Sequence, residues 1–323
     1  MKLANLTKVL ATTALVAFAG SATFAADIAV IGGSNDDAFW NKIKKGIDDA
    51  TPAVEANGGS VNYLRLVNYD NFAPDVVQLI RTAISMDVDG LVIPNWVPEA
   101  EDPAIKDAIA AGITVILMNA GGADKARELG AINYIGNEEY PAGVAGGEYF
   151  AAHGQKHVLC VNTLPGSINT EQRCKGVADA MGQAGAKSTQ LPLPTTSFGD
   201  ATAVAEAIKA ELSKDATIDG VITISAGDAD SAAIGIEQSG RAEGISLASF
   251  DMNEAGLARI KDGKQSFAVD QQPYLQGFLS VSVLASAIDF GTDLPTFPVL
   301  TGPGIVDASN IEATLAGVAK GAR

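Results

Sequence analysis

Short apolar runs that recur along the whole chain constrain its fold more than any other feature. Between them lie segments with apolar residues at helical spacing, as in 76–84 and 203–212. The runs are nearly continuous rather than alternating, which is typical of strands buried on both faces of a parallel sheet. The pattern predicts an α/β protein built from strand–helix–strand units. The ten expected strands are 27–33, 61–67, 90–95, 114–120, 132–137, 157–162, 189–194, 220–225, 246–251 and 267–272.

The number of strands indicates two lobes of similar design. Ten strands are more than one doubly wound sheet usually contains, and 323 residues are enough to form two separate hydrophobic cores. The stretch 220–235 also repeats the strand–loop–helix pattern of 29–40. We expect the first lobe to end near Asn137 and the second near Asp270, after which the long helix expected within 271–288 returns to the first lobe.

The first 25 residues have the pattern of a secretory signal peptide. Lys2 and Lys8 accompany an apolar stretch that runs from about residue 9 to 20, and small residues follow it. The stretch is shorter than the roughly 20 residues that a spanning helix needs, which favours a cleaved signal over a membrane anchor. We expect cleavage after Ala25 or Ala26 and a mature protein that is soluble outside the cytoplasm.

The net charge of −16 limits the partners of this chain. Nucleic acids and anionic membranes attract basic surfaces, so neither is expected as the main partner. Self-repulsion of an acidic surface favours a soluble monomer.

The two cysteines favour a disulfide. Cys160 lies on an expected strand, and Cys174 lies one turn into the helix that follows it. Because a helix packs on its preceding strand and export permits oxidation, we expect a Cys160–Cys174 bridge. Two buried thiols are the alternative.

Polar and aromatic side chains gather where the expected strands end, which is where open parallel sheets bind ligands. Asp, Asn, Gln and Arg side chains can each engage neighbouring hydroxyl groups, and aromatic rings can pack on apolar C–H faces. This combination indicates a neutral polyhydroxylated ligand. The candidate binding residues are Asp36, Asp37, Phe39, Trp40, Asn95, Trp96, Asn119, Asn137, Arg173, Phe198, Asp228, Asp251 and Gln271.

Several of these residues have a structural alternative. Asp36 or Asp37 can cap the helix that follows, and Phe39 and Trp40 can belong to its core face. Trp96 can plug a loop, and Arg173 can be an ordinary helix charge. Asp251 is harder to explain structurally, because a charge at the end of an apolar strand needs a partner.

Sequence signatures of enzymes are scarce. His153 and His157 read as part of a surface turn rather than a metal site. The glycines at 32 and 33 lack the third glycine of a dinucleotide fingerprint, and neither a phosphate-binding loop nor a nucleophile elbow occurs. We therefore expect no metal, no cofactor and no catalysis.

Several segments together resemble the periplasmic sugar-binding proteins of ABC transporters, of the ribose-binding type (periplasmic binding protein type I). The resemblance covers essentially the whole mature chain. The segments are "DDAFW", "DGLVIPN", "GITVILMNA", "YIGNEEYPAGVAGGEY", "QRCKGVADAM", "GDADSAAIG", "ASFDMNEAGLARIKDG" and "AVDQQPYLQGF".

The resemblance implies two doubly wound lobes that are joined by a three-crossing hinge and hold a sugar in the cleft between them. The lobes would be 26–137 plus 271–300 and 138–270 plus 301–323. Asp37 would bind sugar hydroxyls, and Phe39 and Trp40 would flank the ring. By position, Arg173, Asp251 and Gln271 would be polar ligands, with Phe198 as a wall of the second lobe.

One departure from the family pattern concerns the ligand. Asn119 stands where the family often has Asp, and Ala120 stands where ribose binders carry Arg. The change removes one charged group from the site and argues against ribose itself.

The resulting hypothesis is a periplasmic protein that captures a monosaccharide or sugar alcohol and delivers it to a membrane ABC permease. The alternatives are an exported carbohydrate-active enzyme, the sugar-binding core of a transcription regulator, and a sugar receptor for chemotaxis. A regulator would need an N-terminal DNA-binding helix-turn-helix, and a signal peptide occupies that place.

Overall fold

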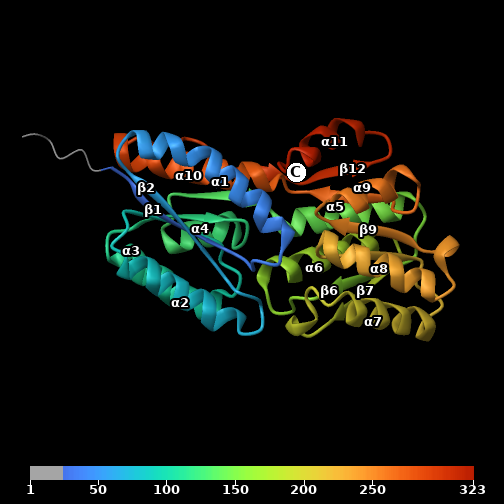
Figure 1. Cartoon of the computed structure of the whole chain (residues 1–323). Coiled ribbons are helices and arrows are strands. Elements are labelled where there is room, and N and C mark those ends of the chain that lie inside the picture. The colour runs from blue at the N-terminus through green and yellow to red at the C-terminus, as the bar shows by residue number, and fades with distance from the viewer. Residues whose placement is uncertain (1–24) are drawn as a thin grey trace, which may run out of the picture.

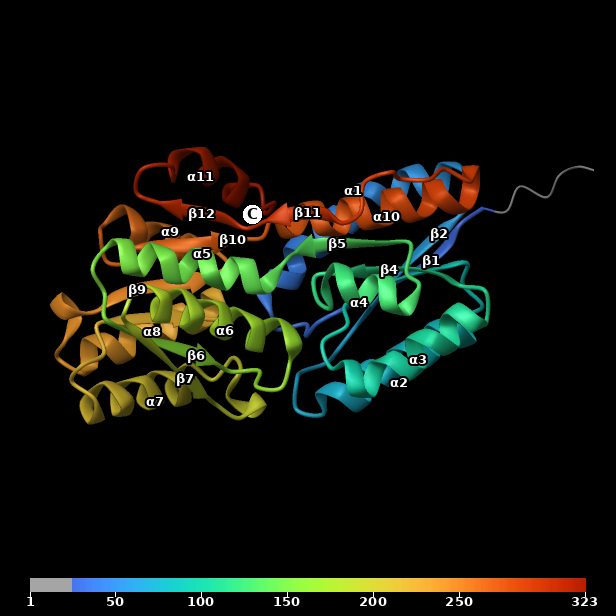
Figure 2. The ribbon, with the colours of Figure 1, turned by 180° about the vertical axis from the view of Figure 1, so that it is seen from behind.

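The computed structural model describes residues 25–323, which form two six-stranded sheets covered by helices (Figures 1 and 2). The first sheet has the order β11-β5-β4-β3-β1-β2, with strands β1 (Asp27–Gly32), β2 (Ser60–Arg65), β3 (Gly90–Ile93), β4 (Thr114–Met118), β5 (Asn133–Asn137) and β11 (Val299–Gly302). The second has the order β12-β10-β9-β8-β6-β7, with strands β6 (His157–Asn162), β7 (Lys187–Pro192), β8 (Gly220–Thr223), β9 (Ser246–Phe250), β10 (Phe267–Asp270) and β12 (Gly304–Asp307).

Helices cover both faces of each sheet in the same way. In the first lobe α1 (Ala38–Ala56) packs beside α10 (Pro273–Phe290), and the other face carries α2 (Phe72–Ser85), α3 (Pro98–Ala110) and α4 (Gly122–Leu129). In the second lobe α6 (Ile168–Gln183) packs beside α5 (Glu139–Ala152), and the other face carries α7 (Ala201–Lys214), α8 (Ala226–Gln238) and α9 (Glu254–Lys261). The short helix α11 (Glu312–Ala319) packs on α9.

The fold class and the ten expected strands are confirmed. All strand pairs are parallel except β10–β12. The helical spacing read in 76–84 and 203–212 is also confirmed, since Val76 and Ile80 in α2 and Val204 and Ile208 in α7 are fully or almost fully buried. Burying each such side chain contributes about 1.5–3 kcal/mol.

The chain passes between the two sheets three times: after β5, after β10 and between β11 and β12. We call the part built on the first sheet the N-terminal lobe and the part built on the second sheet the C-terminal lobe. We expected the second segment of the N-terminal lobe to end at residue 300. β11, which belongs to the first sheet, continues two residues further to Gly302, which pairs with Asn137. Of the expected signal peptide, residues 1–24 lie outside the described residues.

The two lobes repeat one close helix crossing. In the N-terminal lobe, a Cβ on Gly46 of α1 would lie 2.1 Å from the carbonyl oxygen of Tyr274, and one on Gly277 of α10 would lie 2.2 Å from that of Ile43. Only glycine allows such an approach of two helix backbones. This contact holds α10, which begins just after the chain has passed from the second sheet back to the first, against α1. The N-terminus of α1 faces the other lobe.

The same crossing recurs in the C-terminal lobe, between α6 and α5. A Cβ on Gly176 would lie 2.3 Å from the Tyr140 carbonyl oxygen, and one on Gly143 would lie 2.2 Å from that of Arg173. Gly176 occupies the same place in α6 as Gly46 does in α1. In each lobe, close backbone contact therefore joins the helix that follows a connection between the lobes to the helix that begins at the cleft.

Cys160 in β6 and Cys174 in α6 form a disulfide, with their Cα atoms 5.6 Å apart. The bridge fixes the first turns of α6 on the strand that precedes it. Among residues 25–323, no helix combines the length and hydropathy that crossing a bilayer requires.

Replacing Gly176 tests the crossing. We expect Gly176→Ala to lower the free energy of unfolding by about 1–3 kcal/mol, because the added methyl group overlaps the α5 backbone. Gly182→Ala in the same helix is the control, since a Cβ there meets nothing within 4 Å and alanine favours the helix by about 0.5 kcal/mol. Urea unfolding of both variants measures the difference, and equal stabilities would contradict the close crossing.

Candidate functional site

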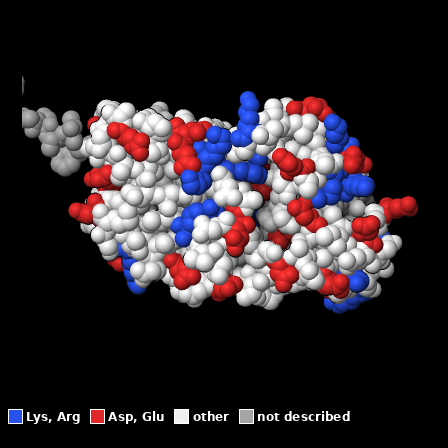
Figure 3. Space-filling view, in the orientation of Figure 1, with Lys and Arg blue, Asp and Glu red and all other residues white. Residues whose placement is uncertain are grey.

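Two adjoining cavities lie where the strand ends of the two lobes meet. The inner cavity has a volume of about 40 Å³, and the outer cavity has a volume of about 290 Å³. Both are lined by residues of the two lobes, and five lining residues are common to them: Asp37, Phe39, Phe198, Ser225 and Asp251. In Figure 3 acidic side chains of both lobes lie beside the seam between the lobes.

The structure brings most of the candidate binding residues to these cavities. The inner cavity contacts Asp37, Phe39, Trp40, Trp96, Asn119, Arg173, Phe198, Asp251 and Gln271, and the outer cavity adds Asp36 and Asp228. Their roles toward a ligand stay predictions.

Asn95 and Asn137 line neither cavity, although each ends or follows a strand as expected. Asn95 donates from Nδ2 to Asp102 Oδ1 at 2.7 Å, and Asn137 donates from Nδ2 to Glu139 Oε2 at 3.3 Å. Both amides therefore bond to carboxylates near them in the chain instead of facing the cleft.

Six aromatic rings in mutual contact surround the cleft. Ring centroids lie 5.5 Å apart for Phe39–Trp40, 5.4 Å for Trp40–Trp96 and 5.2 Å for Trp96–Phe72. The series continues through Tyr69 to Phe198 of the C-terminal lobe, at 5.2 and 4.8 Å. Aromatic residues make up only 6% of the chain, so this group of rings, which includes both of its tryptophans, is a marked local concentration at the cleft.

Tyr69 and Phe72 were not among the candidates. They lie in "NYDNF", residues 68–72, which follows the second apolar run. The rule that ligands bind at strand ends applies to β2 as well, so the signal was present in the sequence.

Asp37 combines two roles that the sequence left as alternatives. Its Oδ1 accepts from the Phe39 amide at 3.0 Å and caps α1, while its Oδ2 accepts from the Tyr69 hydroxyl at 2.9 Å. Burial raises the pKa of Asp37, although these hydrogen bonds and two nearby cations act against the rise. The carboxylate is thus held rigidly at the N-terminus of α1, facing both cavities.

Arg173 is almost fully buried and is oriented by Glu139. Its Nε and Nη2 donate to Glu139 at 2.7 and 3.0 Å, and its Nη1 donates to the Ile224 carbonyl oxygen at 2.8 Å. A guanidinium has five N–H donors, so these three hydrogen bonds leave two of them unused. Burial raises the pKa of Glu139, and the adjacent Arg173 guanidinium lowers it.

Asp251 follows β9 with a left-handed backbone, at φ 64°. Asn119 has the matching position after β4 in the other lobe and the matching φ of 66°. Such a backbone is uncommon for residues other than glycine, although Asp and Asn adopt it more readily than most. The symmetric bends aim one polar side chain from each lobe at the inner cavity.

Asp251 accepts from Gln271 Nε2 at 2.6 Å. Burial raises its pKa to about 7, against the opposing influence of Arg173, Lys42 and the Gln271 amide. Its carboxyl group therefore changes charge near neutral pH.

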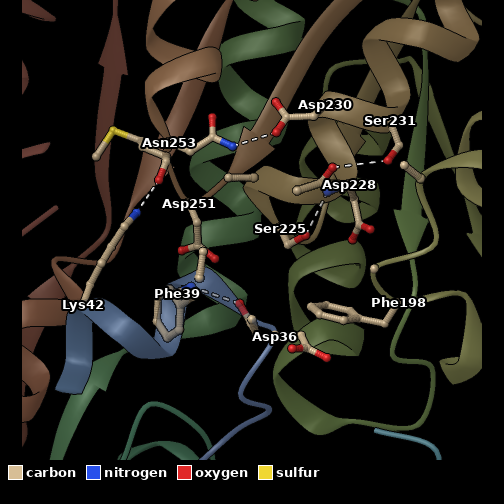
Figure 4. Close-up of a pocket in the computed structure, with 17 residues that line it drawn as sticks. Asp36, Phe39, Lys42, Phe198, Ser225, Asp228, Asp230, Ser231, Asp251 and Asn253 are labelled. Atoms are coloured by element: carbon tan, nitrogen blue, oxygen red, sulfur yellow. Dashed lines mark hydrogen bonds between the residues drawn. The ribbon is translucent and has the colours of Figure 1, made fainter. Parts of the chain in front are cut away.

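The outer cavity is rich in carboxylates (Figure 4). Asp228 accepts from the Thr163 hydroxyl at 2.8 Å, and burial raises its pKa to about 6. Lys42 of α1 crosses the cleft and donates to the Met252 carbonyl oxygen, while burial lowers its pKa. Among residues 25–323 no group of His, Cys, Asp and Glu has the arrangement of a metal site.

The lobes are closed on each other. The Ile168 amide of α6 donates to the Trp96 carbonyl oxygen of the N-terminal lobe at 2.8 Å, and the Tyr69–Phe198 and Lys42–Met252 contacts also span the cleft. Backbone, side-chain and aromatic contacts thus join the two lobes across the cleft.

This arrangement defines a two-lobed binding protein that encloses a small polar solute at a hinged cleft. The chain belongs to the periplasmic binding protein family, whose model, described as "Periplasmic binding protein domain", matches residues 28–293. The predicted family is confirmed. It is a family of extracytoplasmic solute-binding proteins rather than of enzymes.

Known relatives agree with this assignment. The xylose/arabinose-binding protein XylF of Sulfolobus acidocaldarius is 25% identical over 293 residues, which cover 86% of this chain and 70% of the relative. The D-ribose/D-allose-binding protein of Pseudomonas aeruginosa is 25% identical over 200 residues, or 60% of this chain and 61% of the relative. A carbohydrate transporter from Acidothermus cellulolyticus 11B, solved in complex with myo-inositol, is 34% identical, with a TM-score of 0.83 over 92% of this chain and 99% of that chain.

The raised pKa of Asp251 predicts a pH dependence of stability in the ligand-free protein. Because the pKa is near 7 in the folded protein and 3.8 ordinarily, the stability that this group contributes is fully present below about pH 4, is lost as the pH rises from about 4 to about 7, and changes no further above about 7. We expect Asp251→Asn to raise the Tm by about 2–4 °C at about pH 8 and to have less effect at about pH 5. Scanning calorimetry of both proteins tests this, and the same Tm difference at both pH values would contradict it.

Proposed function

We propose that this protein captures a neutral ring-shaped polyol, a monosaccharide or a cyclitol, in the cleft that the inner and outer cavities form together, for uptake by an ABC importer. The observation that carries the proposal is the composition of the inner cavity: flat aromatic rings beside the carboxylates of Asp37 and Asp251 and the guanidinium of Arg173. Such rings suit the C–H face of a sugar or cyclitol, and the charged groups suit its hydroxyl rim.

The charges of the inner cavity favour a neutral ligand over an acidic one. The charge of Arg173 is already balanced by Glu139, and Asp37 and Asp251 add negative charge when ionised. A carboxylate or phosphate on the ligand would be repelled. The complex of the 34% identical carbohydrate transporter with myo-inositol supports a cyclitol as one candidate ligand.

The ligand would stabilise the closed state. Its contacts would come from Asp37 and Trp40 in the N-terminal lobe and from Arg173 and Asp251 in the C-terminal lobe, so they form together only when the lobes meet. The closed protein would then dock on a membrane permease. In this proposal the N-terminal segment is a signal peptide, and the mature protein works as a periplasmic monomer.

Intrinsic fluorescence provides a direct binding test. Trp40 and Trp96 are the only tryptophans of the chain, and both line the inner cavity. Titration with myo-inositol, other cyclitols, pentoses and hexoses should change the emission saturably for at least one compound, and that compound should also raise the Tm. If no neutral polyol alters either signal, the proposed ligand class is wrong.

Asp251→Ala tests the polar part of the site with the compound identified in this way. Hydrogen bonds to a charged group are worth about 1.5–3 kcal/mol, so we expect calorimetric affinity to fall about 10- to 150-fold. Asp124→Ala is the matched control, because that side chain is fully exposed on α4. Unchanged affinity in Asp251→Ala, with an intact fold by circular dichroism, would remove this residue from the site.

A further inference from the structure

The start of β1 lies beside the C-terminal end of α10, far from the cleft (Figure 1). The backbone nitrogen of Ala26 donates to Asp289 Oδ1 at 2.8 Å. Ala26 is completely buried, and its carbonyl oxygen accepts from the Ser60 amide at 3.1 Å, next to the first pair of β1 with β2. This nitrogen therefore has a fixed position at the entry to the sheet.

Asp289 is poorly placed as a carboxylate without a cation. It lies in the last turn of α10, where the helix dipole is unfavourable for negative charge, and that turn has no basic residue. Its Oδ2 is buried and has no hydrogen-bond partner among residues 25–323. A cation at this point would satisfy both the charge and the second oxygen.

The surroundings supply more negative charge instead. The Asp27 amide donates to Asp89 Oδ2 at 2.9 Å, and Asp27 Oδ1 accepts from the Ser60 hydroxyl at 2.6 Å. Within the described part of the chain, none of Asp27, Asp89 and Asp289 forms an ion pair with Lys, Arg or His. The first two backbone nitrogens of this end of the sheet thus each face a carboxylate.

The sequence indicates where a cation can arise. Cleavage between Ala25 and Ala26 would leave small residues, Thr23 and Ala25, at the third and first positions before the cut, as a leader peptidase requires. Cleavage after Ala26 would place Phe24 at the third position and would remove the residue that contacts Asp289.

We propose that a leader peptidase cuts this chain between Ala25 and Ala26, and that the new α-ammonium of Ala26 forms an ion pair with Asp289 that locks β1 to α10. Water adds across the Ala25–Ala26 peptide bond: Ala25 leaves with a carboxylate, and the Ala26 nitrogen takes up protons to become an ammonium. One amide donor is replaced by three donors and a positive charge. The inference rests on the export proposed above, and it concerns a site remote from the ligand.

The cut position is tested by expressing the full chain in a bacterial host and measuring the intact mass of the protein released from the periplasm. We expect a mature chain that starts with Ala26. A start at Asp27, or at any other residue, would overturn the proposal. Ligand binding by tryptophan fluorescence is measured on the same sample, so a failure of the proposed function is seen separately.

The ion pair is tested by a double-mutant cycle on the Tm. One version of the protein starts at Ala26 and the other carries a single glycine before it, which converts the ammonium into an amide; each is made with Asp289 and with Asp289→Asn. We expect the added glycine to lower the Tm by about 2–4 °C with Asp289 and by clearly less with Asp289→Asn. Asp293→Asn, in the exposed segment after α10, is the matched control and should leave the effect of the glycine unchanged.

Two outcomes of this cycle would contradict the ion pair. The first is an equal loss of Tm from the glycine with Asp289 and with Asp289→Asn. The second is no loss in either background. Circular dichroism shows whether Asp289→Asn is folded, and if it is not, the comparison of the two versions with Asp289 still decides whether the ammonium stabilises the protein.

Discussion

Backbone contact at paired glycines is the constraint on which the arrangement of the two lobes depends. Gly46 and Gly277 join α1 to α10, and Gly176 and Gly143 join α6 to α5 in the same geometry. In each pair, one helix follows a hinge crossing and the other begins at the cleft. The backbone contacts therefore hold the helices that carry Asp37 and Arg173 in fixed positions relative to the segments that link the lobes.

Neighbouring polar side chains hold the charged side chains of the cleft in place. Glu139 orients Arg173, Tyr69 orients Asp37, and Gln271 orients Asp251. Charged groups that are buried in this way are costly, as the raised pKa values of Asp251 and Asp228 show. A ligand with hydroxyl groups can offset that cost by donating hydrogen bonds to the carboxylates. The same hydrogen bonds would then contribute both to recognition of the ligand and to the stability of the closed state.

The sequence predicted the regular parts of this structure well. The eight inner strands could be predicted because they form nearly continuous apolar runs that are buried on both faces of their sheets. The edge strands β2 and β7 are half-buried or exposed. β11 and β12 were missed because proline and glycine interrupt "PVLTGPGIVD" and much of it is exposed, which removes the apolar signal. β12 is also antiparallel to its neighbour, β10, unlike the other paired strands.

The candidate site was predicted less evenly. A strand end fixes the position of a residue but not the direction of its side chain, which explains why Asn95 and Asn137 turn to nearby carboxylates. The direction of each side chain depends on which hydrogen-bond partner the tertiary packing brings next to it, and the spacing of residues in the sequence does not reveal that partner.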